Sequence, residues 1–282
     1  MANFKTPLGQ SDDILVGQEN ESRKGGSNRH PNVFYVDKAG KKWTYDDPEI
    51  KAAFKELNRR GLEEPTIGFE DGQLVDYRDE ARRAKGDEWI RQETADQTRK
   101  YNPLREKKIH FIFGNGGTGK STYIRNNDLN NGAYLMDSDE FVENRIDDTN
   151  DSNPERALNT FKVHEESSLL RDKMFEPLIA QGYNIVSPKV KPKLSDIKKF
   201  KDLGYKVGAT FLDADLDTSL TRGLKRYVED RKRLVPTSAY VPQDKLRAMW
   251  KEVVDSGLLD EYYDYDASDP SYKLKLLNSF KR

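Results

Sequence analysis

The sequence predicts an α/β protein in which a mainly parallel sheet is covered by helices on both faces, with a small α+β unit before it. Three observations predict this class. An apolar run at residues 109–113 leads into a glycine-rich loop and then a helix-favouring segment. From there to residue 265, runs of strand length alternate with helical patterns, which is typical of parallel sheets. Residues 31–102 instead show hairpin patterns on either side of a helix, so we expect a flexible N-terminal arm at 1–30, an accessory domain at 31–102 and the α/β domain at 103–282.

The composition excludes several classes of protein. The 282 residues carry a net charge of −1, so the chain as a whole gives no reason to expect nucleic acid or an anionic membrane as partner. The absence of cysteine excludes disulfides and any site built on thiolates. No apolar run approaches the ~18 residues of a membrane-spanning helix. We therefore expect a cytoplasmic protein.

The first helix of the N-terminal unit has clear end signals. Asp47 has the character of an N-cap, Pro48 suits the first helical position, and Gly61 is typical of a helix stop. In order, the unit is expected to contain a hairpin (33–36 with 43–45), this helix, a second hairpin (66–69 with 73–77, around Asp71-Gly72) and a helix at 87–100.

The larger domain is expected to contain alternating strands and helices. Its expected strands are 109–113, 133–136, 184–187, 207–212 and, as the last one, 262–265. Its expected helices are a long one from Asn153-Pro154 to about Gln181, one at about 195–203, one from about Asp217, and one at 242–256.

The loop after the first of these strands matches the phosphate-binding pattern Gly-x-x-x-x-Gly-Lys-Ser. The glycines allow consecutive backbone N–H groups to point at a polyphosphate, Lys120 can reach the β- and γ-phosphate oxygens, and Ser121 is placed to ligate Mg²⁺. The alternative is a glycine-rich turn that ends in Lys-Ser by chance, which the flanking strand and helix disfavour. The predicted nucleotide-binding residues are Gly114, Asn115, Gly116, Gly117, Thr118, Gly119, Lys120, Ser121 and Thr122.

Two carboxylates follow the second strand of the domain, where active groups of parallel sheets gather. Asp137 or Asp139 could accept the proton of an attacking hydroxyl or take part in the Mg²⁺ shell. The alternative is that Ser138 or Asp139 caps a short helix at 140–144.

A cluster of basic residues lies near the end of the helix that begins at about Asp217. Guanidinium groups suit the charge that spreads over a γ-phosphoryl group during transfer. The alternative is a solvated basic helix face, in which these side chains form surface ion pairs. The residues are Arg222, Lys225, Arg226, Arg231, Lys232 and Arg233.

Four segments in this order resemble the zeta toxin family of phosphate-loop kinases. They are Gly114–Thr122, Asp137–Asp139, residues 180–186, and Arg226-Tyr227 followed by Arg233. The resemblance covers residues 104–265 and implies that 103–282 is a P-loop kinase domain.

The resemblance also implies a reaction. Such kinases use ATP and Mg²⁺ to phosphorylate a hydroxyl of a UDP-activated amino sugar, and an antitoxin restrains them. By position, Lys120 would bind the phosphates, Asp139 would be the base, and Arg226 and Arg233 would stabilise the transferring group. Arg231 competes with Arg233 because the spacing is shorter here.

The sequence departs from the family on the side of the phosphoryl acceptor. The family has Glu-Gly-Thr and then Arg after the third strand, where this chain has Ser187–Lys191, and the family's His-Pro is replaced within Phe141–Asn144. Asp137, and Asp172 by its family position, are candidate substrate contacts.

Lysines near the third strand leave a second acceptor class open. They could bind a nucleic acid 5′ end, although a charged loop and exposed helix face is the favoured explanation. They are Lys189, Lys191, Lys193, Lys198, Lys199 and Lys201.

The function we expect is that of an ATP- and Mg²⁺-dependent kinase acting on a hydroxyl of a small molecule. The alternatives are a polynucleotide or nucleoside kinase and an ATP-binding structural module without catalysis. The N-terminal unit would contact a protein partner such as an antitoxin, and nucleic acid is not the expected partner.

Overall fold

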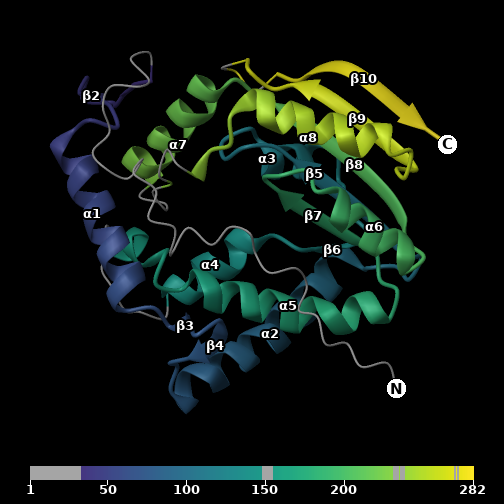
Figure 1. Cartoon of the computed structure of the whole chain (residues 1–282), viewed down its shortest axis with the longest axis horizontal. Coiled ribbons are helices and arrows are strands. Elements are labelled where there is room, and N and C mark those ends of the chain that lie inside the picture. Colours follow the sequence, from purple (N-terminus) through teal and green to yellow (C-terminus); the bar gives the residue numbers. More distant parts are fainter. Residues whose placement is uncertain (1–32, 148–154, 231–234, 236–238, 270, 272) are drawn as a thin grey trace.

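The computed structural model describes residues 33–147, 155–230, 235, 239–269, 271 and 273–282. Its centre is a six-stranded sheet in the order β10-β9-β8-β5-β7-β6 (Figure 1). All neighbouring strands are parallel except β10, which is antiparallel to β9. The expected mainly parallel α/β sheet is therefore confirmed. The strands are β5 (Lys108–Phe113), β6 (Tyr134–Leu135), β7 (Ile185–Lys189), β8 (Lys206–Asp213), β9 (Glu261–Asp266) and β10 (Lys275–Lys281).

Helices cover both faces of this sheet because successive side chains of a parallel strand point to opposite faces. In β5, Phe111 and Phe113 pack in the larger core with α5 (His164–Ala180), α6 (Leu194–Asp202) and α8 (Gln243–Asp255). Ile112 points to the other face and packs in the core that includes α3 (Lys120–Asn126). The remaining helices of this part are α4 (Ser138–Asp147) and α7 (Leu216–Asp230).

The N-terminal part has the expected order of elements. Asp71 and Gly72 have φ angles of 50° and 77° at the turn of the second hairpin, which confirms the turn that the sequence predicts. The elements are β1 (Tyr35–Val36), β2 (Lys42–Trp43), α1 (Pro48–Glu63), β3 (Ile67–Glu70), β4 (Gln73–Asp76) and α2 (Glu80–Tyr101).

Gly61 is not a helix stop, and this expectation was wrong. α1 continues through it to Glu63, and a Cβ atom on Gly61 would lie 2.6 Å from the Cβ of Phe161. The glycine is there because another part of the chain approaches the helix closely, which local sequence does not reveal.

The long helix expected from Asn153 to Gln181 is also shorter in the structure. A 3₁₀ helix, η2 (Glu155–Asn159), comes first, and α5 begins only at His164. Side-chain contacts hold the break: Thr160 donates to the carbonyl of Ala157, and Arg60 of α1 donates to Asn159. Asn153 and Pro154 lie outside the described residues.

The sheet has one strand more than expected. β9 is followed by β10, which forms the edge of the sheet and has no buried residue. The alternating Lys273, Leu274, Lys275 and Leu276 were its only signal in the sequence.

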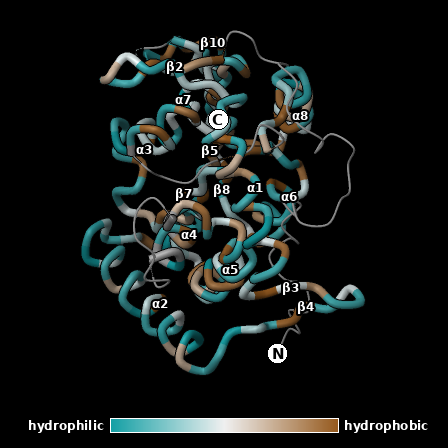
Figure 2. The backbone as a smooth tube through the Cα atoms, turned by 90° about the vertical axis from the view of Figure 1, so that its left-hand side faces the viewer, coloured by the Kyte–Doolittle hydropathy of each residue, from teal (hydrophilic) through white to brown (hydrophobic). Residues whose placement is uncertain are grey.

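The N-terminal part packs against the sheet domain through shared clusters. Trp43, Ile50 and Leu57 are buried together with Leu224 and Tyr227 of α7. α2 is polar along most of its length (Figure 2) and lies against α5 and β6. The domain boundary at residue 102 stays a prediction, and the arm at 1–30 lies outside the described residues.

Candidate active site

The phosphate-loop pattern lies between β5 and α3, at the carboxyl end of the central strand. Gly114, Gly117 and Gly119 have φ angles of 147°, 80° and 90°, which residues with a side chain rarely adopt. A Cβ atom at Gly114 would lie 2.6 Å from the carbonyl oxygen of Leu212, and one at Gly117 would lie 2.9 Å from that of Ser219. The loop therefore needs glycine both for its backbone angles and for the close approach of its neighbours.

Lys120 lies at the first position of α3 and folds back over the loop. Its Nζ donates to the carbonyl oxygens of Gly114 at 2.7 Å and Asn115 at 2.9 Å. A lysine held in this way stands beside the backbone N–H groups that would surround a phosphate, because the loop wraps around both.

Asn115 connects the loop to α8. Its side chain is buried and donates to the carbonyl of Val241 at 2.8 Å, while the N–H of Val241 donates back at 3.0 Å. Both hydrogen-bonding groups of the amide are thus used, and the loop is fixed to the segment that begins α8.

Arg222 of α7 fixes the loop from another side. Only 6% of the residue is exposed, and its guanidinium donates to the carbonyls of Gly117 at 3.1 Å, Ala267 at 3.0 Å and Asp269 at 2.5 Å. This arginine thus joins the loop, at Gly117, to the segment that follows β9, at Ala267 and Asp269, by binding backbone oxygens.

Ser121 and Asp137 line the same hollow. The hollow has a volume of about 630 Å³ and lies between α3, β6 and the end of α2. Its other lining residues are Lys100, Tyr101, Ile124, Arg125, Asp128, Asn130, Asn131 and Leu135. The structure thus places a hydroxyl and a carboxylate that the sequence singled out in the lining of one hollow, beside the start of α3 and the end of β6.

The donor set fits Mg²⁺ bound with a nucleotide. In the described part of the chain, no group of three or more His, Asp or Glu side chains could hold a metal ion alone. Mg²⁺ is usually held by one or two protein oxygens together with phosphates and waters. Ser121 and Asp137 supply oxygens of this kind.

Asp139 lies in the first turn of α4 and is half-buried. Its N–H donates to the carboxylate of Asp137 at 3.0 Å, so Asp137 caps the start of this helix. The sequence had assigned this cap to Ser138 or Asp139 as an alternative to a chemical role. The cap at Asp137 leaves the side chain of Asp139 outside that role.

Asp172 lies on α5 beside Arg171, whose Nε and Nη2 donate to it at 2.9 Å and 2.8 Å. Burial raises the pKa of Asp172, while the charge of Arg171 opposes that shift. Arg171 also donates to the hydroxyl of Ser138 at 2.9 Å. This contact places Asp172 close to the start of α4, where Asp139 lies.

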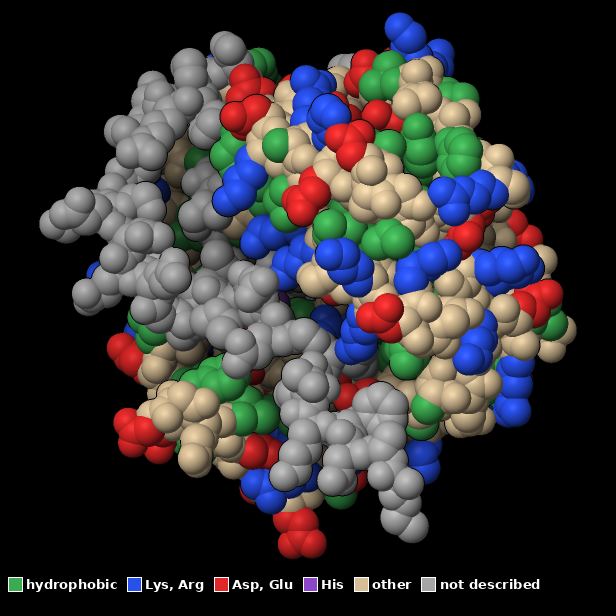
Figure 3. All heavy atoms as spheres, turned by 45° about the vertical axis from the view of Figure 1, so that its right-hand side comes forward, with side chains coloured by type: hydrophobic (Ala, Val, Ile, Leu, Met, Phe, Trp, Pro, Cys, Tyr) green, Lys and Arg blue, Asp and Glu red, His purple; other side chains and the backbone are tan. Residues whose placement is uncertain are grey.

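The lysines after β7 do not form a uniform exposed row. Lys189 binds Asp196 at 2.6 Å and Lys201 binds Asp260 at 2.9 Å. Lys199 is half-buried, and among the described residues it makes no hydrogen bond or ion pair. Burial lowers the pKa of Lys199, whereas the nearby carboxylate of Asp172 raises it. On the face that comes forward in Figure 3, basic and acidic side chains are mixed.

The structure describes Arg226 but not the other two arginines that were predicted to stabilise the transferring group. Arg226 lies one turn beyond Arg222 on α7, is exposed, and makes no hydrogen bond or ion pair with the described residues. Arg231 and Arg233 lie outside the described residues. The catalytic roles of Lys120, Asp139 and the arginines stay predictions.

Sequence reasoning missed two contributors to this site. It treated Asn115 only as a loop residue, although an amide within a glycine-rich loop is a signal for a side-chain contact. It also treated Lys199 as one of a row of surface lysines.

Residues 91–255 match the family described as zeta toxin, and these residues make up more than half of the chain. The chain belongs to the zeta toxin family. The match includes the phosphate loop, Asp137–Asp139 and α7, so the site described above lies within the family's domain. Among curated proteins, none matches this zeta toxin family member.

Solved structures show the same fold. The PezAT chromosomal toxin–antitoxin system of Streptococcus pneumoniae aligns with a TM-score of 0.52 and 13% identity, over 72% of this chain and 83% of the other. The AvrRxo1-ORF1:ORF2 complex aligns with a TM-score of 0.56 and 19% identity, over 72% and 68%. The complex of the same proteins with ATP aligns with a TM-score of 0.53 and 19% identity, over 70% and 68%. In the part of this zeta toxin family member that the structure describes, no helix has the length and apolar character needed to span a bilayer.

Proposed function

We propose that this protein is an ATP- and Mg²⁺-dependent kinase that transfers the γ-phosphoryl group to a hydroxyl of a small anionic molecule, a UDP-activated amino sugar. The observation that carries the proposal is the phosphate loop between β5 and α3, with Ser121 and Asp137 lining one hollow beside it. Family membership and a neighbour solved with ATP support the choice of nucleotide.

The phosphate side of the site would bind the negative charge of the ATP phosphates. Lys120 would move from the carbonyls of Gly114 and Asn115 to the phosphate oxygens, and the N–H groups of the loop would bind the same anion. Ser121 and Asp137 would hold the magnesium ion, which supplies charge neutralisation between the phosphates. Arg226, which is exposed and unpaired among the described residues, would bind the transferring group.

The acceptor side would be formed by α4, α5 and the end of β7. Asp139 would accept the proton of the attacking hydroxyl, because it follows the second strand in the first turn of α4, a helix that Asp137 caps. Asp172 would orient the acceptor by hydrogen bonding to it.

The choice of an anionic acceptor rests on Lys199. A half-buried ammonium without a direct partner among the described residues favours an anion as its ligand, such as a diphosphate. The neighbouring Lys189 is already paired with Asp196, and Lys201 is paired with Asp260, so these lysines do not act together as an extended basic surface. This supports a nucleotide sugar over a nucleic acid strand, whose binding needs many phosphate contacts.

The proposal is tested by incubating the protein with Mg²⁺ and γ-labelled ATP against UDP sugars, nucleosides and 5′-hydroxyl oligonucleotides. We expect label on a UDP-amino sugar and none with Lys120→Ala. Label on an oligonucleotide with a steep salt dependence would instead indicate a polynucleotide kinase. ATP binding without transfer to any acceptor would refute the kinase and leave an ATP-binding module.

The partner we propose is a protein antitoxin, and the compartment is the cytoplasm, where ATP and nucleotide sugars are found. The support is that solved neighbours are a toxin–antitoxin system and a two-protein complex. Expression of the chain in bacteria should arrest growth, and expression of Lys120→Ala should not. Equal growth of both would refute the toxic role without bearing on phosphoryl transfer.

A further inference from the structure

Near both of its ends, α4 is joined to α5, the other helix on the acceptor side. Near the sheet, Arg171 of α5 donates to Ser138 of α4 at 2.9 Å. At the far end, Arg145 of α4 donates to Glu166 of α5 through Nε at 2.9 Å and Nη2 at 2.8 Å. α4 is therefore held against α5 at the turn that carries Asp139 and again about two turns later.

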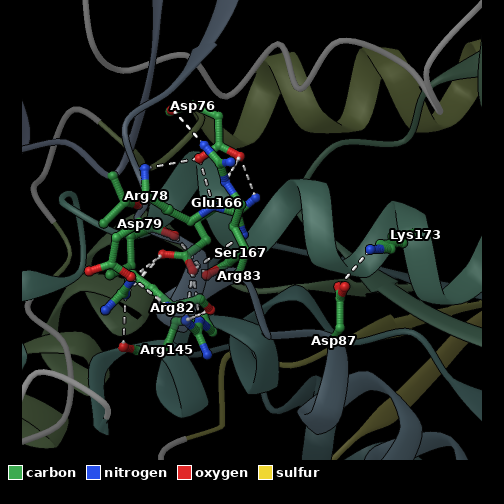
Figure 4. Close-up of polar contacts among 12 residues, drawn as sticks. Asp76, Arg78, Asp79, Arg82, Arg83, Asp87, Arg145, Glu166, Ser167 and Lys173 are labelled. Carbon is green, nitrogen blue, oxygen red and sulfur yellow. Dashed lines mark hydrogen bonds and ion pairs between the residues drawn. The ribbon is translucent and has the colours of Figure 1, made fainter. Parts of the chain in front are cut away.

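Glu166 is the centre of the far contact (Figure 4). Its side chain is 0% exposed and that of Arg145 is 1% exposed, so water does not compensate either charge. Arg82 of α2 binds the second carboxylate oxygen through Nε at 2.9 Å and Nη2 at 2.8 Å, and Arg78 approaches the first at 3.5 Å. A buried carboxylate needs such partners, because leaving one charge unpaired is costly.

The N-terminal part supplies two of these partners. Arg82 and Arg145 also exchange contacts with each other's backbone, at 3.4 Å and 3.3 Å. Arg78 is in turn neutralised by Asp76, whose carboxylate accepts from it at 2.7 Å and 2.8 Å. The charges thus form one connected group that spans β4, α2, α4 and α5.

The same helix α2 holds the strand on the other side of Asp139. The side chain of Gln97 accepts from the N–H of Leu135 at 2.8 Å and donates to its carbonyl at 3.2 Å. Leu135 is the last residue of β6, two residues before Asp137. Both segments that flank Asp137–Asp139 are therefore fixed to α2, one through Gln97 and the other through Arg82.

We propose that Arg82 is a positioning residue for phosphoryl transfer: it completes the charge on Glu166, which holds Arg145 and thereby sets where α4 presents Asp139 to the acceptor. This inference rests on the proposed kinase function. It makes the segment from Asp76 to Tyr101 a working part of the catalytic domain and not a detachable accessory.

The test compares three variants of the full chain. Arg82→Ala removes the contacts with Glu166, and Arg91→Ala is the control. Arg82→Lys keeps the charge but lacks the planar guanidinium whose Nε and Nη2 both donate to one carboxylate oxygen. Arg91 lies on the same helix and is 67% exposed, and its ion-pair partner among the described residues is Glu88, at the i, i+3 spacing. For each variant, kcat, the KM of the acceptor and the affinity for ATP are measured well below the unfolding transition.

For Arg82→Ala we expect kcat to fall by about 10²-fold, because a small displacement of a catalytic group is enough for such a loss. The affinity for ATP should stay within about twofold, since the hydrogen bonds of this cluster given above join β4, α2, α4 and α5 and leave the phosphate loop on β5 and α3. Arg82→Lys should have an intermediate kcat, and Arg91→Ala should match the wild type. If Arg82→Ala fails to fold, Arg82→Lys decides the matter by the same comparison of kcat with ATP affinity.

Two results would overturn the inference. One is an unchanged kcat in folded Arg82→Ala or, failing that variant, in Arg82→Lys. The other is a parallel loss of kcat and ATP-binding capacity, which indicates only that less protein is folded. A wild-type protein without transfer to any acceptor would refute the proposed function itself, and this inference would fall with it.

Discussion

Arg222 and Arg226 lie one turn apart on α7, but we expect their loss to have different effects. Arg222 is buried and donates to three backbone carbonyls, whereas Arg226 is exposed. We therefore expect Arg222→Ala to reduce stability and Arg226→Ala to reduce catalysis. The pair is well matched, because both changes remove the same side chain from the same helix.

The size of the stability loss follows from the contacts. Each lost hydrogen bond costs about 1 kcal/mol. The bond to Ala267 is buried and those to Gly117 and Asp269 are partly buried, so Arg222→Ala should cost up to about 3 kcal/mol. For a chain of this size that loss lowers the melting temperature by roughly 6–12 °C. Arg226→Ala should change the free energy of unfolding by less than about 0.5 kcal/mol.

For kcat we expect the reverse: Arg226→Ala should lose more activity than Arg222→Ala. An arginine that binds the transferring phosphoryl group contributes a factor of about 10³ or more to kcat. Thermal unfolding followed by circular dichroism, together with phosphoryl transfer from γ-labelled ATP, measures both quantities on the same samples. Arg226→Ala with full activity would refute its catalytic role, and Arg222→Ala with a wild-type melting temperature would refute the support that we assign to it.

Three further predictions concern other parts of the chain. Asp139→Ala should abolish transfer while the affinity for ATP, measured by equilibrium binding, stays as in the wild type; a parallel loss of binding would contradict its role as base. Gly61→Ala should destabilise the protein by about 1–3 kcal/mol in urea unfolding, because its Cβ would lie 2.6 Å from that of Phe161; a neutral effect would mean that α1 can shift freely. The imidazole of His110, whose Nδ1 lies 3.6 Å from Oε1 of Glu261, lowers the pKa of Glu261 from 4.5 to about 2. The unfolded chain therefore binds more protons between these values, and stability should fall as pH drops from about 4.5 to about 2. Glu261→Gln should flatten that acid limb in a series of melting curves, and an unchanged limb would assign it to other carboxylates.

The phosphate loop and the second hairpin could be predicted because their causes are local. Gly114, Gly117 and Gly119 adopt positive φ angles, and so does Gly72 of the hairpin. The need for such angles is visible in the sequence as glycine at fixed spacing, before any tertiary contact is known. Strands that are buried on both faces were visible for a similar reason, as short runs of apolar residues.

The differences arise where distant parts of the chain meet. Gly61 looked like a helix stop, but its role is the close approach of Phe161, one hundred residues away. The roles of Arg222 and Arg226 could not be separated, because the sequence places both near the loop without saying which one faces it. β10 was not predicted, because an edge strand without buried residues has no apolar run in its sequence.

The two edges of the central sheet are unlike each other. At β6, the amide of Gln97 occupies the N–H and carbonyl of Leu135 as a neighbouring strand would, so that edge is closed to further pairing. At the opposite edge, β10 shows Leu276, Leu277 and Phe280 to solvent. As far as the described residues show, another strand could therefore extend the sheet only beside β10. Removing residues 275–281 would uncover β9 in its place, and the partly buried tyrosines of that strand would become the new boundary with water.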